Sequence, residues 1–375
     1  MAAQAGVPAL QADSLSCPWS QSTRERSPPL SSRQVADSES LLVIRLSSLG
    51  DVLFAVPAVQ AIQDSGRFER VSWLVEDRAA GLLRDLVPLD ELIVFPRKAM
   101  GQWPGHIARL ARRRDQLVLD LQCSMKSRLQ RLFLKAPRSV GFDAPVAREG
   151  AERSLTERIA PPAAARHRVA ANLSLLPALG LPIPPTVARP RLQLDPARVA
   201  EQRRLLSNGG ESRPVIVLHP GTSAFGRLKR WDPLNFAALG ARLAASHEAL
   251  LYVSGTAAEE DLVAPILAQL GARARRLPPG SISHLATQLA ATDLLIAADS
   301  FPLHLANALA TPVVGLFGPK DPAVNGPFFD RSRVVRSGVA CSPCTLRRCV
   351  ERLCMTSLCV DSVEAAAAEL LLTYR

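Results

Sequence analysis

Residues 41–62 constrain the fold of this chain more than any other stretch, because an apolar strand there runs through a short turn into a helix. The first four residues of the stretch are all apolar, which is typical of a strand covered on both faces in a parallel sheet. Ser47, Ser48 and Gly50 predict the turn, and Asp51 follows it directly. Ligands of open α/β sheets bind where strands end and helices begin, so the Asp51 carboxylate is predicted to point into a binding crevice.

A purely structural role for Asp51 is the main alternative. Aspartate is a favoured N-cap residue, and its carboxylate would accept hydrogen bonds from the first free N–H groups of the helix, in residues 52–54. Such caps are common, so this stretch alone leaves catalysis and capping equally open.

The charge of the chain favours an anionic partner. The 375 residues carry a formal net charge of +11, and most of the cations are arginines. This excess favours phosphate-rich small molecules, acidic membrane surfaces or nucleic acid. Aromatic residues are only 5% of the chain, which leaves few side chains to stack on bases, so no nucleic-acid partner is expected.

The N-terminus and the cysteines indicate where the protein works. Residues 1–39 are rich in Ser, Gln, Pro and Arg without periodicity and are predicted to be a disordered tail or an overlong gene start. No apolar run reaches the roughly 20 residues of a membrane span, and the N-terminus lacks the layout of a secretory signal. Most of the seven cysteines lie in one short cluster, which is poor evidence for exported disulfides. We therefore expect a cytoplasmic protein.

Strands alternate with helices along the rest of the chain, which predicts parallel βαβ units and an α/β fold. The expected strands lie within 41–45, 71–75, 91–95, 116–122, 214–221, 250–255, 293–300 and 311–319. A chain of this length usually forms two domains, and the proline-rich residues 182–196 predict the boundary. We expect one domain over 40–185 and a second over 186–375, which includes the cysteine cluster 341–359 and a C-terminal helix.

The second half contains a candidate site for a diphosphate. The segment HPGTSAFGRLKRW, residues 219–231, combines a loop of small residues with Lys229 and Arg230. Backbone N–H groups, the hydroxyls of Thr222 and Ser223 and the lysine charge are what a diphosphate needs. A solvated basic loop is the usual alternative, but the position directly after a strand favours binding.

Further polar residues surround this candidate site. Asp299 and Ser300 lie where a strand ends and a helix begins, and that helix N-terminus favours negative charge. Because Asp299 would repel a phosphate, sugar hydroxyls are its expected partners. His304 lies one helical turn further on, and a packing or hydrogen-bonding role is expected for it rather than proton transfer. Glu259 follows another strand and is placed to bind ribose hydroxyls, although spacing alone favours an ordinary surface glutamate.

Metal chemistry has limited support in the sequence. The chain contains neither D-x-D nor G-x-x-x-x-G-K-[ST], so the charge of a bound nucleotide must be neutralised by the protein. Cys341 and Cys344 stand in C-x-x-C spacing, and with Cys349 and Cys354 they could close a tetrahedral structural zinc site. A second C-x-x-C is absent from the sequence, so reduced thiols or an opportunistic disulfide are about as well supported.

Four segments of the chain occur together in the order and spacing of a known protein family. They are RLSSLGDVLFAVPA, HPGTSAFGRLKRW, the pair DSFPLHLANAL and TPVVGLFGPKDP, and the C-x-P-C cluster, and LDLQCSMKS and VGFD match as well. In this order and spacing they resemble the ADP-heptose:lipopolysaccharide heptosyltransferases, glycosyltransferase family nine, over nearly everything after Glu39. The resemblance implies a GT-B fold, in which two Rossmann-like, doubly wound parallel-sheet domains face a central cleft. The acceptor would bind the first domain and the donor nucleotide the second.

The resemblance also implies a reaction, namely an inverting transfer of heptose from ADP-heptose to the lipopolysaccharide inner core without an obligatory metal. Asp51 would act as the general base on the acceptor hydroxyl, and Lys229 would stabilise the charge of the leaving diphosphate. Donor-binding residues are expected at Thr222, Ser223, Lys229, Glu259, Asp299, Ser300 and His304, and acceptor-binding residues at Ser48, Gly50, Gln122 and Lys126.

One departure from the family pattern leaves alternatives open. Phe301 stands where the family usually has glycine, and its bulk could narrow the donor pocket, so another sugar nucleotide or another glycan acceptor is an alternative. Alternatives of another class are a nucleotide-sugar-binding protein without turnover and a zinc-dependent nucleic-acid binder. In the leading hypothesis the basic first domain meets the anionic core at the inner face of the cytoplasmic membrane by peripheral contact, through Lys126, Arg128 and Arg131.

Overall fold

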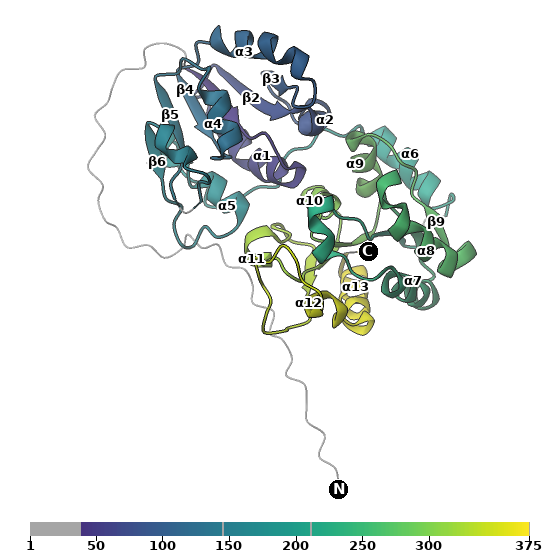
Figure 1. Cartoon of the computed structure of the whole chain (residues 1–375). Coiled ribbons are helices and arrows are strands. Elements are labelled where there is room, and N and C mark those ends of the chain that lie inside the picture. Colours follow the sequence, from purple (N-terminus) through teal and green to yellow (C-terminus); the bar gives the residue numbers. More distant parts are fainter. Residues whose placement is uncertain (1–38, 145, 211, 375) are drawn as a thin grey trace.

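Two parallel sheets of six strands each organise the protein in the computed structural model, one in each lobe of Figure 1. The structure describes residues 39–144, 146–210 and 212–374. The predicted class is confirmed, because both lobes are α/β domains built on a parallel sheet with flanking helices. Of the predicted tail, only Glu39 is described, and its carboxylate pairs with Arg67 at 3.1 Å.

The first domain is built around β1, which is buried on both faces. Its strands are β1 Ser40–Ile44, β2 Arg70–Glu76, β3 Glu91–Phe95, β4 Leu117–Asp120, β5 Arg138–Phe142 and β6 Glu157–Ile159. Its helices are α1 Leu49–Asp64, α2 Asp77–Leu86, α3 Trp103–Ala111, α4 Met125–Arg131 and α5 Arg168–Leu173, with 3-10 turns at Met100–Gln102, Ala151–Ser154 and Leu176–Leu179. Leu41 and Val43 belong to the core formed with α1, whereas Leu42 and Ile44 belong to the core formed with Leu110 of α3. This double burial explains the unbroken apolar run of the sequence.

The second domain repeats this plan. Its strands are β7 Val215–His219, β8 Leu250–Val253, β9 Ala274–Arg276, β10 Leu294–Ala298, β11 Val313–Leu316 and β12 Ser332–Val335. Its helices are α6 Pro196–Leu206, α7 Pro233–His247, α8 Glu260–Leu270, α9 Ile282–Ala290, α10 Phe301–Ala308, α11 Pro322–Asn325, α12 Leu353–Thr356 and α13 Val360–Tyr374, with 3-10 turns at Ala224–Lys229, Ala257–Glu259 and Gly271–Arg273. Asp232 caps α7 by accepting a hydrogen bond from the backbone N–H of Leu234 at 2.8 Å. None of the described helices is long and apolar enough to cross a bilayer.

The order of strands locates the crevice of each sheet. The first sheet runs β3-β2-β1-β4-β5-β6 and the second β12-β11-β10-β7-β8-β9, and all neighbouring strands are parallel. In a doubly wound sheet of this order, ligands bind at the carboxyl ends of the two central strands, because the strand order reverses between them and leaves a crevice there. These strands are β1 and β4 in the first domain and β7 and β10 in the second. The loops after these four strands are therefore where a site is expected.

The eight strands predicted from the sequence are all present, whereas β5, β6, β9 and β12 were missed. The missed strands are three to five residues long and carry polar or half-exposed residues, so they lack the apolar run that marks a central strand. The predicted linker, residues 182–196, contains no helix or strand before α6 begins at Pro196. The domain boundary itself stays a prediction.

The two domains meet where α1 of the first approaches α10 of the second (Figure 1). The rings of Phe54 and His304 lie 4.6 Å apart between their centroids. Nearby, His167 accepts a hydrogen bond from Val169 N–H through Nδ1, and its Nε2 lies 3.0 Å from the carbonyl oxygen of Gly326 in the second domain. Burial lowers the pKa of His167 to about 4. The ring is therefore neutral at physiological pH, and its Nε2–H donates to the Gly326 carbonyl across the domain contact.

Candidate functional site

The first half of the site lies at the N-terminus of α1, directly after β1. Ser48 is the N-cap residue, and its backbone N–H and Oγ donate hydrogen bonds to Asp51 Oδ2 at 3.3 and 2.9 Å. Asp51 is therefore the third residue of the helix and not its N-cap. The alternative in which Asp51 caps residues 52–54 is wrong, although its carboxylate does support the N-terminus of α1 through Ser48.

Arginine side chains keep the Asp51 carboxylate ionised. Arg45 Nη2 lies 2.8 Å from Asp51 Oδ1, and Arg168 also acts on this carboxylate electrostatically. Burial acts to raise the pKa of Asp51, but the charges of Arg45 and Arg168 and the hydrogen bonds from Ser48 outweigh burial and hold the pKa below its ordinary value. About 28% of the Asp51 side chain remains exposed, so the carboxylate is accessible to a ligand.

A cavity of about 340 Å³ opens beside Asp51. It is lined by the loops that follow β1, β4 and β5 and by the first turns of α5, all in the first domain. Three of the four predicted acceptor-binding residues, Ser48, Gln122 and Lys126, line this cavity together with Asp51. The sequence therefore identified one wall of a real cavity at the carboxyl ends of β1 and β4.

Gln122 and Lys126 also shape the loops of the cavity. Gln122 Oε1 accepts hydrogen bonds from the backbone N–H groups of Leu46 and Ser47 at 2.8 and 3.2 Å, which ties the loop after β4 to the loop after β1. Lys126 Nζ donates to Ser47 Oγ at 3.1 Å and pairs with Glu76, a buried carboxylate, at 2.8 Å. Both side chains are thus partly engaged by the protein itself.

Gly50, the fourth predicted acceptor-binding residue, lies apart from the cavity. The residue lies inside the first turn of α1 and not in the loop before it, and it does not line the cavity. A Cβ at this position would lie 3.4 Å from Cδ2 of His304 in the second domain. This distance is an ordinary van der Waals contact, so α1 and α10 lie close together at Gly50, and the acceptor contact predicted for Gly50 stays untested.

The second half of the site is a network of three side chains at the end of β10. Lys229 Nζ donates hydrogen bonds to the carbonyl oxygen of Asp299 at 2.6 Å and to its Oδ2 at 3.0 Å. Burial acts to raise the pKa of Asp299, but the hydrogen bond from His304 and the charge of Lys229 lower it to about 2. Because Asp299 is ionised, His304 Nε2, 3.1 Å from Oδ1, must be the donor.

Two polar atoms beside this network have no partner among the described side chains. They are Ser300 Oγ and His304 Nδ1, and both are fully buried. Buried polar atoms in folded proteins nearly always form hydrogen bonds, so each such exception points to a bound water, ion or ligand. The N-terminal end of α10 therefore offers hydrogen bonds that the protein does not use itself.

The loop after β7 supplies the remaining predicted donor residues. Thr222 is buried and its Oγ1 accepts a hydrogen bond from Arg230 Nε at 3.2 Å, whereas Ser223 is exposed. Glu259 is buried, which argues against the surface role that spacing favoured. Its Oε2 accepts hydrogen bonds from the backbone N–H and Oγ1 of Thr256, both at 2.9 Å. Its carboxylate also lies against Gly221, where any side chain would collide with it.

The two halves of the site meet through His304, which bonds to Asp299 on one side and approaches Gly50 and Phe54 on the other. The cavity beside Asp51 is lined only by first-domain residues, so Lys229 and Asp299 lie outside its wall. An ionised carboxylate thus lies at the carboxyl ends of the central strands of the first sheet, and a cation–carboxylate pair lies at those of the second sheet. This arrangement suits a reaction between two ligands, one held by each domain.

Comparison with known proteins identifies the family. The model of glycosyltransferase family 9 (heptosyltransferase) matches residues 105–354, which is more than half of the chain. The chain belongs to glycosyltransferase family 9. It is similar to lipopolysaccharide heptosyltransferase 1 of Pseudomonas aeruginosa, with 29% identity over 319 residues that cover 81% of this chain and 85% of the relative. It is also similar to the lipopolysaccharide core heptosyltransferase OpsX of Haemophilus influenzae, with 26% identity over 79% of this chain and 84% of the relative.

Solved structures of family 9 share the fold. A family 9 glycosyltransferase from Veillonella parvula matches with a TM-score of 0.75 and 18% identity, over 90% of this chain and 98% of the other. ADP-heptose lps heptosyltransferase II of Escherichia coli matches with a TM-score of 0.69 and 23% identity, over 89% of this chain and 98% of the other. The predicted GT-B fold is thus confirmed. Membership of family 9 confirms the predicted glycosyltransferase class.

Three arginines of this family 9 enzyme lie where the sequence analysis did not predict them. Arg45 and Arg168 line the cavity beside Asp51, and neither was predicted. Arg131 was predicted to contact the acceptor or the membrane, but it is buried, pairs with Asp120 at 2.9 Å and donates to backbone carbonyls. That prediction is wrong, because a single basic run in the sequence does not show which side chain turns inward.

The cysteine cluster of the family 9 chain does not form a metal site in this structure. All six described cysteines are free thiols, including Cys341, Cys344, Cys349 and Cys354. Within residues 39–144, 146–210 and 212–374, no group of three or more His, Cys, Asp or Glu side chains is placed to hold a metal ion. Burial and then the charges of Cys344, Cys341 and Cys349 raise the pKa of Cys354, so these four thiols lie near one another, and both the structural zinc and the reduced thiols stay predictions.

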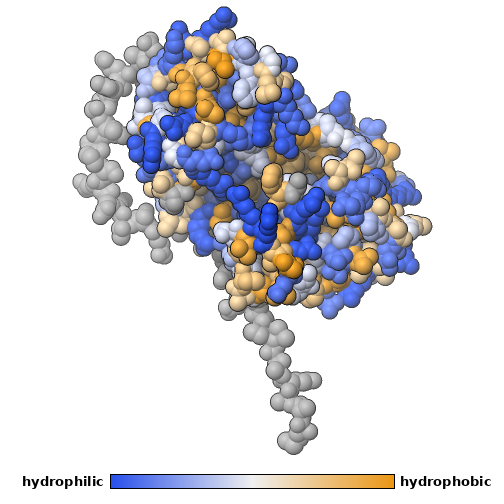
Figure 2. All heavy atoms as spheres, in the orientation of Figure 1, coloured by the Kyte–Doolittle hydropathy of each residue, from blue (hydrophilic) through white to orange (hydrophobic). Residues whose placement is uncertain are grey.

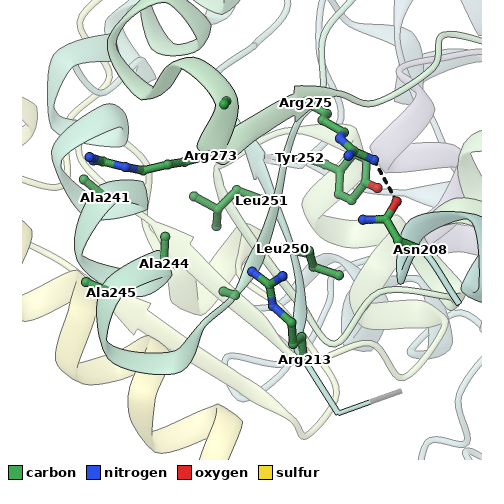
Figure 3. A pocket seen from close by; sticks show the side chains of 12 residues that line it. Asn208, Arg213, Ala241, Ala244, Ala245, Leu250, Leu251, Tyr252, Arg273 and Arg275 are labelled. Atoms are coloured by element: carbon green, nitrogen blue, oxygen red, sulfur yellow. Dashed lines mark hydrogen bonds between the residues drawn. The ribbon is translucent and has the colours of Figure 1, made fainter. Parts of the chain in front are cut away.

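A larger cavity, of about 540 Å³, lies in the second domain at the opposite end of its sheet (Figure 3). It is lined by alanines of α7, by the start of β8 and by Arg213, Arg273 and Arg275. Figure 3 shows that the guanidinium groups diverge, because Arg275 turns to Asn208, with which it bonds at 2.7 Å, and Arg273 extends over α7. Neither Asp51 nor Lys229, the two catalytic residues predicted from the sequence, lines this cavity.

Proposed function

We propose that the protein transfers heptose from ADP-heptose to the lipopolysaccharide inner core, with inversion at the anomeric carbon and without an obligatory metal. The observation that carries the proposal is the ionised Asp51 carboxylate, which lines a cavity at the central strand ends of the first sheet. Family membership supports the reaction class, and the names of the two similar curated proteins support heptose as the sugar and lipopolysaccharide as the acceptor.

In the proposed step, the acceptor hydroxyl gives its proton to Asp51 while its oxygen forms a bond to the anomeric carbon. The bond from that carbon to the diphosphate oxygen breaks, and ADP leaves with the electron pair. Attack from the face opposite the leaving group inverts the configuration. Lys229 stabilises the charge that develops on the diphosphate, a role that a metal ion fulfils in other transferases.

The remaining donor contacts are proposed for polar residues of the second domain. Thr222 and Ser223 would hold the diphosphate, Glu259 the adenosine ribose, and Asp299 with Ser300 and His304 the heptose and its phosphate. The unpartnered Ser300 Oγ and His304 Nδ1 support this assignment. Phe301, half-buried at the start of α10, packs against the core beside these groups, and it is the reason to test other sugar nucleotides.

The proposal is tested by following ADP release from ADP-heptose with a truncated lipopolysaccharide core as acceptor, in the presence of a metal chelator. We expect acceptor-dependent release that the chelator does not abolish. Release of the nucleotide only from another nucleotide-sugar would show that this compound, and not ADP-heptose, is the donor. Binding of nucleotide-sugars without any release would support the non-catalytic alternative, and activity restored by a divalent cation would contradict metal independence.

Peripheral membrane contact is the second part of the proposal, and an apolar surface on α4 supports it. The apolar α4 surface comprises Met125, Leu129, Leu132 and Phe133, which are 37–63% exposed. Figure 2 shows hydrophobic residues gathered over α4 beside α3, and the two helices are joined by a 2.7 Å hydrogen bond between His106 and Gln130.

The neighbourhood of the apolar α4 surface fits an anionic bilayer at the cytoplasmic face. The half-buried Arg128 and the exposed Lys135 stand among its apolar residues in the sequence, and basic residues beside exposed apolar ones are typical of interfacial binding. Ser124, the N-cap residue of the same helix, lines the cavity beside Asp51. A lipid-linked acceptor held at this surface would therefore be close to the base.

Replacing Leu129 and Leu132 together by Gln is expected to weaken binding to anionic vesicles about tenfold or more, since burying one such side chain contributes roughly 1.5–3 kcal/mol. Turnover with a short, lipid-free acceptor should not change. Co-sedimentation with anionic and neutral vesicles measures the effect, and Leu346→Gln with Val350→Gln makes the same change on an exposed loop of the second domain. Equal vesicle binding by both double variants, or loss of a dimer from the first, would contradict the proposal.

A further inference from the structure

Residues 336–352 form a long loop after β12 that has no hydrophobic anchor of its own. They contain no helix or strand, and none of these side chains is buried. Two large apolar residues of the loop, Leu346 and Val350, are 61% and 98% exposed. A segment that buries so little of its own surface usually needs a disulfide or a metal ion to hold one shape.

Three cysteines of this loop and a fourth just beyond it have the spacing of a metal site. Two residues separate Cys341 from Cys344, and four separate Cys349 from Cys354. Structural zinc sites use cysteine pairs with two to four residues between them. The other three thiols all act electrostatically on Cys354, so the four lie near one another in space as well as in the sequence.

The surroundings of the four thiols favour ionised sulfur. The backbone N–H of Arg352 donates to Cys349 Sγ at 3.3 Å, and a hydrogen bond to sulfur favours the thiolate form. Residues 336–352 also include four arginines and a single carboxylate, Glu351. Four thiolates around a divalent cation carry a net charge of about −2, which this excess of arginine offsets. The loop therefore suits a metal–thiolate group electrostatically.

The turn after β11 brings two of the four cysteines to one place. The backbone N–H of Cys344 donates to the carbonyl oxygen of Pro319 at 2.8 Å. Gly318 lies against Cys354, and a Cβ at this glycine would be 3.0 Å from Cys354 Sγ. Cys344 and Cys354 thus contact neighbouring residues of the same turn, although one belongs to the loop and the other to α12.

We infer that four cysteine thiolates bind one Zn²⁺ ion and thereby fix the loop 336–352. They are Cys341, Cys344, Cys349 and Cys354. Soft sulfur ligands select zinc over magnesium and calcium, and each thiol releases its proton to solvent as its bond to zinc forms. No three of these thiols are placed around one point in the described structure. Because the loop buries none of its residues, closing the thiols on an ion breaks no packed core.

The site is linked to the loop that carries Lys229. Trp231, two residues beyond Lys229, is buried, and its Nε1–H donates to the carbonyl oxygen of Leu358 at 3.0 Å. Trp231, Leu358 and Cys354 belong to one hydrophobic core cluster. An ion at Cys354 would therefore stabilise the packing behind this loop. The inference goes beyond the proposed function, because the zinc holds the fold and takes no part in the transfer.

Metal analysis of the full chain, purified under reducing conditions without chelator or affinity tag, tests the site. We expect roughly one zinc ion per chain. Co²⁺ exchanged into the protein should show the visible absorption of a tetrahedral ion with thiolate ligands. Removing the zinc with a strong chelator should lower the thermal midpoint by about 5 °C or more. Protein that holds iron or no metal, or a disulfide between two of the four cysteines, would overturn the inference.

Matched cysteine variants separate the site from damage to the fold. Cys341→Ser removes an exposed ligand, and it should lower the zinc retained after dialysis against a competing chelator at least about tenfold. Cys359→Ser is the control, because Cys359 is also exposed and its Sγ contacts Ser362 Oγ at 3.0 Å. Cys354→Ser removes the buried ligand and should lose zinc in the same way. Equal zinc content in Cys341→Ser and Cys359→Ser would contradict a site made of these four thiols.

The measurements need no turnover, so a failure of heptose transfer would not be mistaken for a failure of the zinc site. The activity assay with chelator also tells the two kinds of metal apart. Loss of a structural zinc lowers the thermal midpoint together with turnover, whereas loss of an ion that the reaction requires changes turnover at an unchanged midpoint.

Discussion

Replacing Asp51 by Asn is expected to lower kcat by roughly 10²- to 10⁴-fold, which is the usual contribution of a positioned general base. The amide keeps the shape of the side chain and an oxygen that can accept from Ser48, but it cannot take the proton of the acceptor hydroxyl. The KM for the donor should change little, because the cavity beside Asp51 is lined only by first-domain residues. Steady-state ADP release with each substrate varied in turn measures both parameters.

The same variant distinguishes catalysis from helix stabilisation. If Asp51 only supports the N-terminus of α1, Asp51→Asn will retain its turnover and lose about 1 kcal/mol of unfolding free energy, as at other helix N-termini. Asp77→Asn is the matched control, because Asp77 is the acidic residue in the first turn of α2 in the same domain and does not line the cavity. Equal activity of the two variants would remove Asp51 from the mechanism.

The low pKa of Asp51 predicts how kcat/KM depends on pH. A carboxyl group whose pKa lies below its ordinary value remains ionised at every pH above the usual aspartate range, which centres on about 3.9. For the wild type, kcat/KM should therefore show no loss on the acid side until the pH falls below that range. A decline that begins near neutral pH would have to come from another group and not from Asp51.

The fold could be predicted from the sequence wherever burial on both faces leaves an apolar run. Strands such as β1 and β10 are continuous apolar segments because helices cover the two sides of each sheet, whereas β6 and β9 are short and half-polar. The strand order could not be predicted, since alternation of strands and helices is compatible with several windings of the sheet. It is the order that brings the loops after β1 and β4 together.

The candidate site was predictable only where its residues follow the central strands that the sequence reveals. Asp51, Lys229 and Asp299 stand directly after central strands or in the glycine-containing loop that follows one, so their positions along the chain already indicate the crevice. Arg168 is the first residue of α5, which follows an edge strand that the sequence did not reveal, and only the packing of α5 brings it to the cavity. Arg131 shows the converse, because Asp120, the buried last residue of β4, pairs with this arginine and holds it inside the domain.

Replacing Lys229 by Met is the second change with a large expected effect. Lys229 is the cation closest to the Asp299 carboxylate, and in the proposed reaction it stabilises the charge on the departing ADP. Removing one such preorganised donor costs roughly 10²- to 10³-fold in kcat in well-studied enzymes, and we expect a loss of this size together with weaker donor binding. ADP affinity by calorimetry and ADP release under saturating donor measure the two effects separately.

A structural role for Lys229 makes a different prediction, because its ammonium group already bonds to the backbone and side chain of Asp299. If that bond only fixes the loop after β7, Lys229→Met will lower the thermal midpoint and leave the turnover of the folded fraction intact. Arg227→Met is the control, since Arg227 is an exposed cation in the same 3-10 turn. Lys229→Arg keeps the charge and should retain much of the ADP affinity. A loss of turnover shared by Arg227→Met and Lys229→Met would show that the overall charge of the loop matters, and not a contact made by Lys229 in particular.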